Sequence, residues 1–266
     1  MTAPQPGRRV LLSSASVFPE PLDAAFEIAS DLGYDGLEVM IWGDPPSQDA
    51  DAIAELIDLA QLPVGSVHAP CLLITARVWG TEPGPKLARS VRLAHRIGAR
   101  TVVVHPPFRW QARYARQFSA GVRALEEQSG QVIAIENMFP TRVGSRKLSA
   151  YAPHWDVAGG PFEHLTLDTS HTAVSHSDPV AMLARMGERL AHVHIADGTG
   201  KPTDEHLVPG RGTGRCAEVL QALPAAYAGD IVVEVSTRAL DRERRMADLA
   251  EALEFTRRHL ASTARS

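Results

Sequence analysis

Histidine and carboxylate side chains stand directly after short apolar runs at several points along this chain. Six of these runs end in the sequences SVHA, VVVHP, IAIEN, LTLDTSH, HVHIAD and VVEVS. A charged group beside buried apolar residues is costly unless it is paired or bound to a metal ion. Mixed imidazole and carboxylate ligands suit Zn²⁺, Mn²⁺ or Fe²⁺ better than Mg²⁺ or Ca²⁺. The pattern therefore predicts a site for one or more divalent metal ions.

The ionisable residues at these positions form one candidate set. Its members are His68, His105, Glu136, Asp168, His171, His192, His194, Asp197 and Glu234. The loop TDEHLVPGRG, which follows the HVHIAD run, adds Asp204 and His206. His192 and His194 are two residues apart and share one face of a strand, so only one of them needs to bind metal. Asp197 is expected to orient one of the imidazoles.

The elements that must position this set alternate in a regular way. Apolar runs rich in Val, Ile and Leu predict strands over residues 9–14, 35–41, 62–69, 99–106, 131–137, 163–169, 190–197 and 229–236. Amphipathic patterns predict helices over residues 21–33, 49–62, 84–99, 110–128, 178–190, 215–227 and 242–260. Gly33 and Gly98 suit the carboxyl ends of two helices. After Glu136 the pattern is irregular, with a long loop and only a short helix around Trp155.

Strict alternation of strand and helix favours a parallel sheet covered by helices. Eight such units in 266 residues indicate closure into a (β/α)8 TIM barrel. The first strand is not followed by the Gly-x-Gly-x-x-Gly turn of a dinucleotide-binding domain. We therefore expect residues 1–266 to form a single α/β barrel domain with frayed termini at about residues 1–7 and 261–266. Active sites of such barrels lie at the carboxyl ends of the strands, where the candidate set is expected to meet.

Composition and charge narrow the function classes. The chain is 44% hydrophobic and 22% charged, has a formal net charge of −4 and contains two cysteines. The acidic balance argues against a nucleic-acid partner, because DNA-binding proteins usually carry a basic face. No run is long enough to cross a membrane, and the N-terminal residues lack the apolar core of a signal peptide. We therefore expect a cytoplasmic protein that acts on a small molecule and has no membrane partner.

The motifs IEN, LDTSH, HIAD and VVEVS resemble those of the xylose isomerase-like barrel superfamily, and the resemblance runs from the second predicted strand to the eighth. This superfamily includes sugar isomerases and epimerases, hydroxypyruvate isomerase, inosose dehydratase and endonuclease IV. The resemblance implies the same barrel fold and a metal-dependent enzyme. It also leaves a homo-oligomer open, since barrels of this superfamily often form dimers or tetramers.

The sugar isomerase and epimerase branch implies one metal ion held by Glu136, Asp168, His194 and Glu234, with His171 in contact with the substrate. The two glutamates would face opposite sides of a carbon next to a carbonyl, one removing a proton and the other returning one. The metal would stabilise the enediolate between these steps. On this resemblance, the first hypothesis is an isomerase or epimerase of a sugar, sugar acid, cyclitol or related polyol, with or without a phosphate.

Endonuclease IV offers the alternative hypothesis of a phosphoesterase, because this chain is similar to it at all nine metal-ligand positions. These are His68, His105, Glu136, Asp168, His171, His194, Asp204, His206 and Glu234. Three zinc ions would then share the site, and a metal-activated hydroxide would attack a phosphodiester. The loop after the third predicted strand departs from the nuclease, since Cys71 stands where the nuclease typically has Tyr. The two branches together predict one to three ions of Zn²⁺, Mn²⁺ or Fe²⁺ per chain.

Three further residues are expected to contact the sugar-like substrate. Glu38 ends the second predicted strand in DGLEVM, where it would bind substrate hydroxyls or hydrogen-bond a ligand imidazole. Arg211 lies in the PGRG turn and is the best single candidate for an anion contact. Trp110, like Trp42, lies in or near a predicted rim loop, and aromatic residues at a barrel mouth commonly stack on sugar faces.

Overall fold

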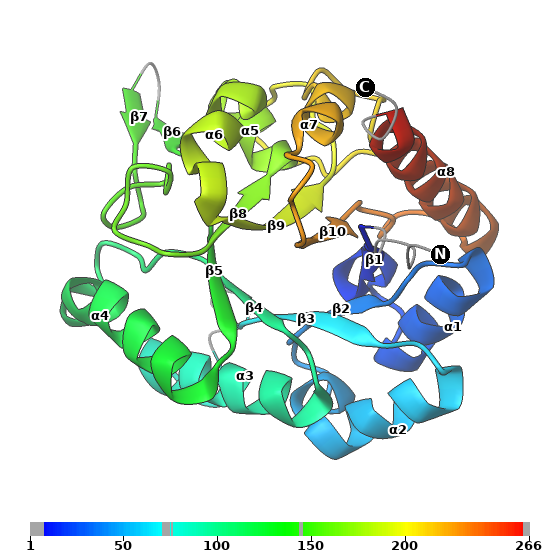
Figure 1. Cartoon of the computed structure of the whole chain (residues 1–266), viewed down its shortest axis with the longest axis horizontal. Helices are drawn as coiled ribbons and strands as arrows, with labels where there is room; N and C mark the ends of the chain where they lie inside the picture. Colours follow the sequence, from blue (N-terminus) through cyan, green and yellow to red (C-terminus); the bar gives the residue numbers. More distant parts are fainter. Residues whose placement is uncertain (1–7, 71–74, 76, 144–145, 263–266) are drawn as a thin grey trace.

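Eight parallel strands close into a barrel with helices around the outside, which confirms the predicted fold (Figure 1). This computed structural model describes residues 8–70, 75, 77–143 and 146–262, so Cys71 lies outside the described residues. The strands pair in the order β1-β10-β9-β8-β5-β4-β3-β2. Their bounds are β1 Val10–Ser13, β2 Leu37–Met40, β3 Val64–His68, β4 Thr101–Val104, β5 Val132–Glu136, β8 Leu165–Asp168, β9 Leu190–Ile195 and β10 Asp230–Val233.

The helices form a ring outside the strands (Figure 1). They are α1 Leu22–Leu32, α2 Ala50–Ala60, α3 Pro83–Ile97, α4 Ala112–Ser129, α5 Thr169–Ser175, α6 Pro179–Met186, α7 Cys216–Ala222 and α8 Arg242–Ser262, with 3-10 turns at Ser14–Val17, Pro46–Gln48 and Gly187–Arg189. Helices α1 and α3 end at Gly33 and Gly98, whose φ angles are +78° and +74°. Glycine adopts this left-handed conformation without a Cβ clash, so both predicted helix ends are confirmed.

The segment between β5 and β8 differs from the prediction. Its described residues contain an antiparallel hairpin of β6 (Thr141–Val143) and β7 (Arg146–Leu148). The short helix expected around Trp155 is wrong, because the described residues there form turns and bends. The carbonyl of Trp155 accepts a hydrogen bond from Met138 N at 2.8 Å, so this backbone bonds to the chain after β5 instead of to its own helical turn.

Parallel pairing brings the predicted strand ends to the same rim of the barrel. Asp168 of β8 stands in register with His194 of β9. Alternate residues of a barrel strand face inward, so His192 lies on the same face as His194 and one layer deeper. Its Nε2 is 3.0 Å from Glu38 Oε2 across the barrel, although β2 and β9 are not neighbours in the sheet. The inside of the barrel therefore holds a polar layer beneath the rim.

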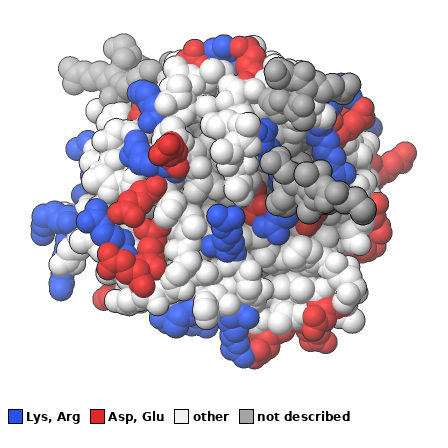
Figure 2. Space-filling model, in the orientation of Figure 1, with Lys and Arg blue, Asp and Glu red and all other residues white. Residues whose placement is uncertain are grey.

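Charged side chains of both signs are interspersed on the face of the molecule shown in Figure 2. That face has no continuous basic surface of the kind that tracks a nucleic-acid backbone. Within the described part of the chain, no helix is both long enough and apolar enough to cross a bilayer.

Candidate functional site

Four side chains from adjacent strands meet at the carboxyl rim: Glu136 of β5, Asp168 of β8, His194 of β9 and Glu234 directly after β10. Each offers one ligand atom, and the four atoms lie within 4.8 Å of one another. His194 Nδ1 is 3.2 Å from Glu136 Oε1, 2.9 Å from Glu234 Oε2 and 3.8 Å from Asp168 Oδ2. The structure thus brings together the four residues expected around a single ion.

The chemistry of this cluster fits a divalent cation. Asp168 Oδ2 is buried and has no hydrogen-bond partner among the described residues. The other oxygen of Asp168 accepts hydrogen bonds from Ser170 Oγ at 2.9 Å and His171 N at 2.8 Å. Three carboxylates that converge on one point repel each other unless positive charge lies between them. Together with an imidazole, they form a donor set that Zn²⁺ or Mn²⁺ would bind.

The buried charges of the cluster set each other's protonation. Burial lowers the pKa of His194, but the carboxylates of Glu38, Glu234 and Glu136 raise it well above its ordinary value. Burial raises the pKa of Glu136, but His105 and His194 lower it well below its ordinary value. Glu136 is therefore an anion, and the imidazole carries a proton that a bound cation would displace.

Glu136 also reaches a second pair of histidines. Its Oε2 lies 3.1 Å from His68 Nε2 and 2.9 Å from His105 Nε2, while its Oε1 faces His194. Both histidines are buried, one at the end of β3 and one directly after β4. The carboxylate thus connects the four-residue cluster to the His68–His105 pair, so one buried anion contacts both groups of candidate ligands.

His171, Asp204 and His206 form a third group. Asp204 Oδ2 lies 3.0 Å from His171 Nε2 and 2.8 Å from His206 Nε2. The Nδ1 atom of His171 donates to Asn137 O at 2.7 Å, and the Nδ1 atom of His206 donates to Glu234 O at 2.7 Å. Both rings therefore direct Nε2, the ligand atom of a neutral imidazole, toward Asp204. Burial lowers the pKa of His206, but Asp204 and Glu234 raise it to about 10.

Glu38 lies beneath the cluster and is 0% exposed, so the expectation that it binds substrate hydroxyls is not met. Its Oε2 accepts hydrogen bonds from Ser66 Oγ at 2.7 Å and His192 Nε2 at 3.0 Å. Its Oε1 lies 3.0 Å from His194 Nε2. A carboxylate behind a ligand histidine fixes the tautomer and the ring orientation. Of the two roles expected for Glu38, the structure therefore favours the contact with a ligand imidazole.

We expect Glu38→Gln to lower the affinity for Mn²⁺ by about 10- to 100-fold while the barrel stays folded. A neutral amide keeps the volume of Glu38 but holds the proton on His194 Nε2 less strongly, so Nδ1 is presented less often as a ligand. Competition titration against a chelating dye measures the affinity, and thermal unfolding monitors the fold. Glu55→Gln on the exposed side of α2 is the matched control. Unchanged Mn²⁺ affinity in Glu38→Gln would show that Glu38 acts only in packing.

Asp197 and Arg211 do not belong to the cluster. The Asp197 carboxylate accepts backbone hydrogen bonds from Gly198 at 2.8 Å, Gly210 at 2.9 Å, Gly212 at 3.0 Å and Gly214 at 2.7 Å. A Cβ on Gly212 would lie 2.4 Å from Asp197 Oδ1, so this close wrap requires glycine. The expectation that Asp197 orients an imidazole is therefore wrong, because its oxygens hold the glycine loop.

The guanidinium of Arg211 points to α8, where it binds side chains of that helix and not an anionic group of a substrate. Its Nη2 lies 2.7 Å from Asp248 Oδ1, and its Nε donates to Glu251 Oε1 at 3.0 Å. These hydrogen bonds raise the pKa of Arg211 further above its ordinary value. The structure thus does not bring Arg211 to the site, since its donors are already engaged by two carboxylates.

Trp110 lies in the loop after β4 and is 62% exposed. Its ring stacks on Phe108 at 4.3 Å between centroids, and Phe108 stacks on Tyr151 at 5.0 Å. The indole has an exposed aromatic surface, and its contact with a sugar-like substrate stays a prediction.

A cavity of about 470 Å³ opens beside the cluster, and part of its lining was not predicted from the sequence. It is lined by Ala15, Phe18, Met40, Trp42, His206, Glu234, Val235, Ser236 and Arg238. Phe18 follows the first strand and Arg238 follows the last. In a closed barrel these two strands pair, so the loops after them lie next to each other. That adjacency was the signal that could have identified Phe18 and Arg238.

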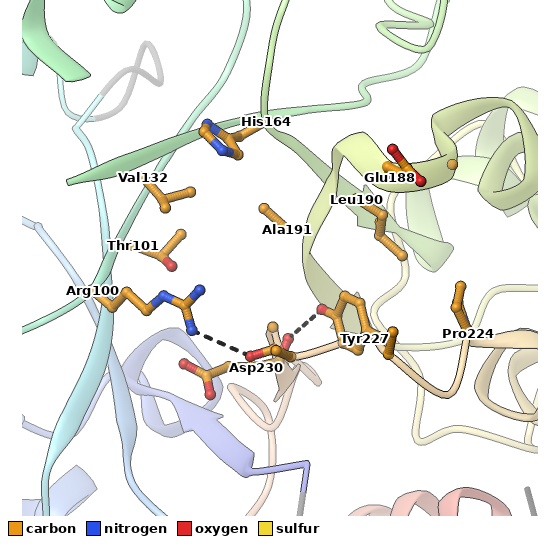
Figure 3. Close-up of a pocket in the computed structure, with 14 residues that line it drawn as sticks. Arg100, Thr101, Val132, His164, Glu188, Leu190, Ala191, Pro224, Tyr227 and Asp230 are labelled. Carbon is orange, nitrogen blue, oxygen red and sulfur yellow. Dashed lines mark hydrogen bonds between the residues drawn. The ribbon is translucent and has the colours of Figure 1, made fainter. Parts of the chain in front are cut away.

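A second cavity, of about 480 Å³, lies where the barrel strands begin, and Figure 3 shows the residues that line it. Its lining includes the first residues of four strands, which are Thr101, Val132, Leu190 and Asp230. Tyr227 Oη donates to Asp230 O at 3.0 Å within it. Because the ligand clusters lie at the carboxyl ends of the strands, this cavity is separate from the candidate site.

The sequence matches the family described as xylose isomerase-like TIM barrel over residues 26–259. An uncharacterized protein of Mycobacterium tuberculosis (strain ATCC 25618 / H37Rv) is 50% identical over 277 residues, covering 96% of this chain and 99% of that protein. An uncharacterized protein of Mycobacterium leprae (strain TN) is likewise 50% identical, with the same shares of the two chains.

Solved structures with the same fold are more distant in sequence. D-psicose 3-epimerase from Clostridium cellulolyticum H10 has a TM-score of 0.71 at 15% identity, covering 95% of this chain and 99% of that one. A D-tagatose 3-epimerase-like protein has a TM-score of 0.68 at 21% identity, covering 94% and 98%. A xylose isomerase domain protein from Alicyclobacillus acidocaldarius has a TM-score of 0.70 at 20% identity, covering 97% and 99%. At these identities the likeness concerns the fold.

Proposed function

Because the chain belongs to the xylose isomerase-like TIM barrel family, we propose that it is a metal-dependent isomerase or epimerase of a sugar or related polyol. The reaction moves a proton at a carbon next to a carbonyl. The observation that carries this proposal is the double position of Glu234, which belongs to the four-residue cluster and also lines the 470 Å³ cavity. Similar structures named as sugar epimerases support the choice of reaction.

In this mechanism Glu136, Asp168, His194 and Glu234 would hold one divalent ion, Zn²⁺ or Mn²⁺. When bound, such an ion supplies a Lewis acid that polarises the substrate carbonyl and acidifies the neighbouring C–H bond. Glu234 faces the cavity, where its carboxylate takes the proton from carbon or returns it. Glu136, kept anionic by His105 and His194, serves the opposite side of the substrate carbon. His171 is proposed to contact the substrate.

Solvent deuterium incorporation tests this function directly. The Mn²⁺-loaded protein is incubated in D₂O with a panel of ketoses and their phosphates, and the carbon-bound proton next to the carbonyl is followed by NMR. The proposal predicts exchange with at least one member and formation of its isomer or epimer. Absence of exchange across the panel, together with cleavage of abasic-site duplex DNA, would establish the phosphoesterase instead.

One arrangement favours that phosphoesterase as the second candidate function. Glu136 connects two groups of ligands, and the His171–Asp204–His206 group directs two Nε2 atoms at one carboxylate. Two or three ions held this way would clamp the attacking and leaving oxygens of a phosphodiester. The number of ions per chain therefore separates the two functions, with one tightly bound ion expected for the isomerase.

His206→Ala is the variant that separates the two functions most clearly. For a single-ion isomerase we expect one bound ion per chain to remain, because His206 contacts only the backbone of Glu234 in the four-residue cluster. Proton exchange should slow by no more than about 10-fold, the lower end of effects from groups behind a ligand. Elemental analysis measures the number of bound ions, and exchange kinetics measure the rate. His95→Ala, at an exposed position of α3, is the control. Loss of one ion together with nearly all activity would favour the multinuclear site.

A further inference from the structure

The cavity beside the metal cluster has two aromatic walls and one basic residue. The rings of Phe18 and Trp42 stack with their centroids 5.6 Å apart and an angle of 19° between their planes. Arg238 Cζ lies 5.0 Å from the Phe18 ring centroid. Arg238 is the one Lys or Arg among the described residues that line this cavity. Loops after β1, β2 and β10 therefore place a cation on an aromatic face beside Glu234.

The guanidinium of Arg238 has no ion pair or hydrogen bond to the described residues, and the cation–π contact is its one recorded interaction. Two nearby arginines differ in this respect. Arg242 lies 3.1 Å from Glu20 Oε2 and 2.8 Å from Glu27 Oε1, and Arg245 also pairs with Glu20. Glu20 and Glu27 are thus engaged by other arginines, and the donors of Arg238 stay available to a ligand.

The position of this cation limits the chemistry of the ligand it would bind. A guanidinium carries five N–H donors in a planar fork that matches a carboxylate or a phosphate. Stacking on Phe18 holds the guanidinium in place, which lowers the entropy lost when it binds an anion. The opposite charge pattern holds at the metal cluster, where Glu136, Asp168 and Glu234 are acidic. These carboxylates would offset the charge of a bound divalent ion, so an anionic group on the substrate is expected to bind at Arg238.

We propose that the substrate is an anionic sugar derivative, a sugar phosphate or a sugar acid, whose anionic group binds Arg238 while its carbonyl end faces Glu234. The proposal rests on the isomerase or epimerase function above and names its substrate class. A cavity of about 470 Å³ lies within the range of pockets that enclose molecules of this size. Phe18 and Trp42 supply apolar lining of the cavity for the sugar carbons between the two ends.

Three ketoses that differ only at carbon 6 test the proposal: D-fructose, D-fructose 6-phosphate and D-fructuronate. Calorimetric titration into the Mn²⁺-loaded protein compares their affinities, irrespective of turnover. We expect the wild type to bind at least one of the two anionic ketoses about 10- to 100-fold more tightly than D-fructose, the range for hydrogen bonds to a charged group. The phosphate and carboxylate arms identify which anion the site takes.

Arg238→Gln should remove this preference, so that neither anionic ketose binds more tightly than D-fructose. Arg89→Gln is the matched control, because Arg89 Cζ also lies over an aromatic ring, that of Trp79 at 4.5 Å, outside this cavity. Equal binding of all three ketoses by the wild type would overturn the anion site. An equal loss for all three in Arg238→Gln would also overturn it, since Arg238 would then act on cavity shape.

The same measurements distinguish this inference from the proposed function. If Arg238-dependent preference for an anionic ketose is found but no ketose exchanges a carbon-bound proton, the anion site stands and the isomerase function fails. If exchange occurs with a neutral ketose and is unaffected by Arg238→Gln, the function stands and the anionic substrate class fails.

Discussion

Glu234→Gln is expected to leave the barrel folded and to slow exchange of the carbon-bound substrate proton by about 10²- to 10⁴-fold. Glu234 lines the cavity, and its Oε2 lies 2.9 Å from His194 Nδ1. A glutamine side chain has the same length and volume but cannot accept a proton at physiological pH. The change therefore removes the proposed acid or base without opening a hole beside the substrate.

The measurement pairs NMR exchange rates in D₂O with elemental analysis, because Glu234 is also a proposed ligand. At saturating Mn²⁺ the variant is loaded, so a remaining loss of exchange reports proton transfer and not metal depletion. Glu55→Gln on α2 is the matched glutamate-to-glutamine control and should retain the wild-type rate. Full exchange activity in Glu234→Gln would show that another group moves the proton.

The location of the site was predictable because parallel barrel strands are buried and end at one rim. The strand ends and the family resemblance therefore predicted that Glu136, Asp168, His194 and Glu234 would converge, and the structure places their ligand atoms within 4.8 Å of each other. The helix α5 was not predicted, because seven residues are too few for a periodic pattern. It begins after β8 because Asp168 accepts a hydrogen bond from His171 N.

The depth at which Glu38 lies inside the barrel could not be predicted from the sequence of its own strand. Strand β2 continues to Met40, which stands in register with His68, whereas Glu38 stands in register with Ser66. Two residues along a strand correspond to one layer inside the barrel. Glu38 therefore belongs to the layer beneath the histidines of the rim, and this follows only once the pairing of β2 with β3 is known.

The glycine loop shows a similar limit of local sequence. Arg211 was predicted as an anion contact from its place in the PGRG turn, and spaced glycines are typical of backbone that wraps an anion. The anion in the structure is the chain's own Asp197, which accepts from Gly210, Gly212 and Gly214. Which carboxylate fills such a turn depends on tertiary packing, so the motif alone could not separate a ligand from an internal partner.

Asp168→Asn is expected to lower the affinity for Mn²⁺ by more than about 100-fold. Changing a residue that only hydrogen-bonds to a metal ligand costs about 10- to 100-fold, and Asp168 is itself a proposed ligand. The two oxygens of Asp168 have separate tasks. Oδ1 caps α5 by accepting from His171 N at 2.8 Å, whereas Oδ2 is buried without a hydrogen-bond partner among the described residues. Asparagine can keep the capping oxygen, so the substitution removes charge from the ligand position and spares the helix.

Competition titration measures the Mn²⁺ affinity of this variant, and thermal unfolding separates loss of ligand from loss of fold. Asp178→Asn is the matched control, because Asp178 caps α6 through Val180 N and Ala181 N but is exposed and outside the cluster. Asp168→Ala would remove the cap as well, at a further cost of about 1 kcal/mol in the free energy of unfolding. If Asp168→Asn bound Mn²⁺ as tightly as the wild type, the unpartnered oxygen would have to be explained without a cation. The grouping of Glu136, His194 and Glu234 as ligands would then fail with it.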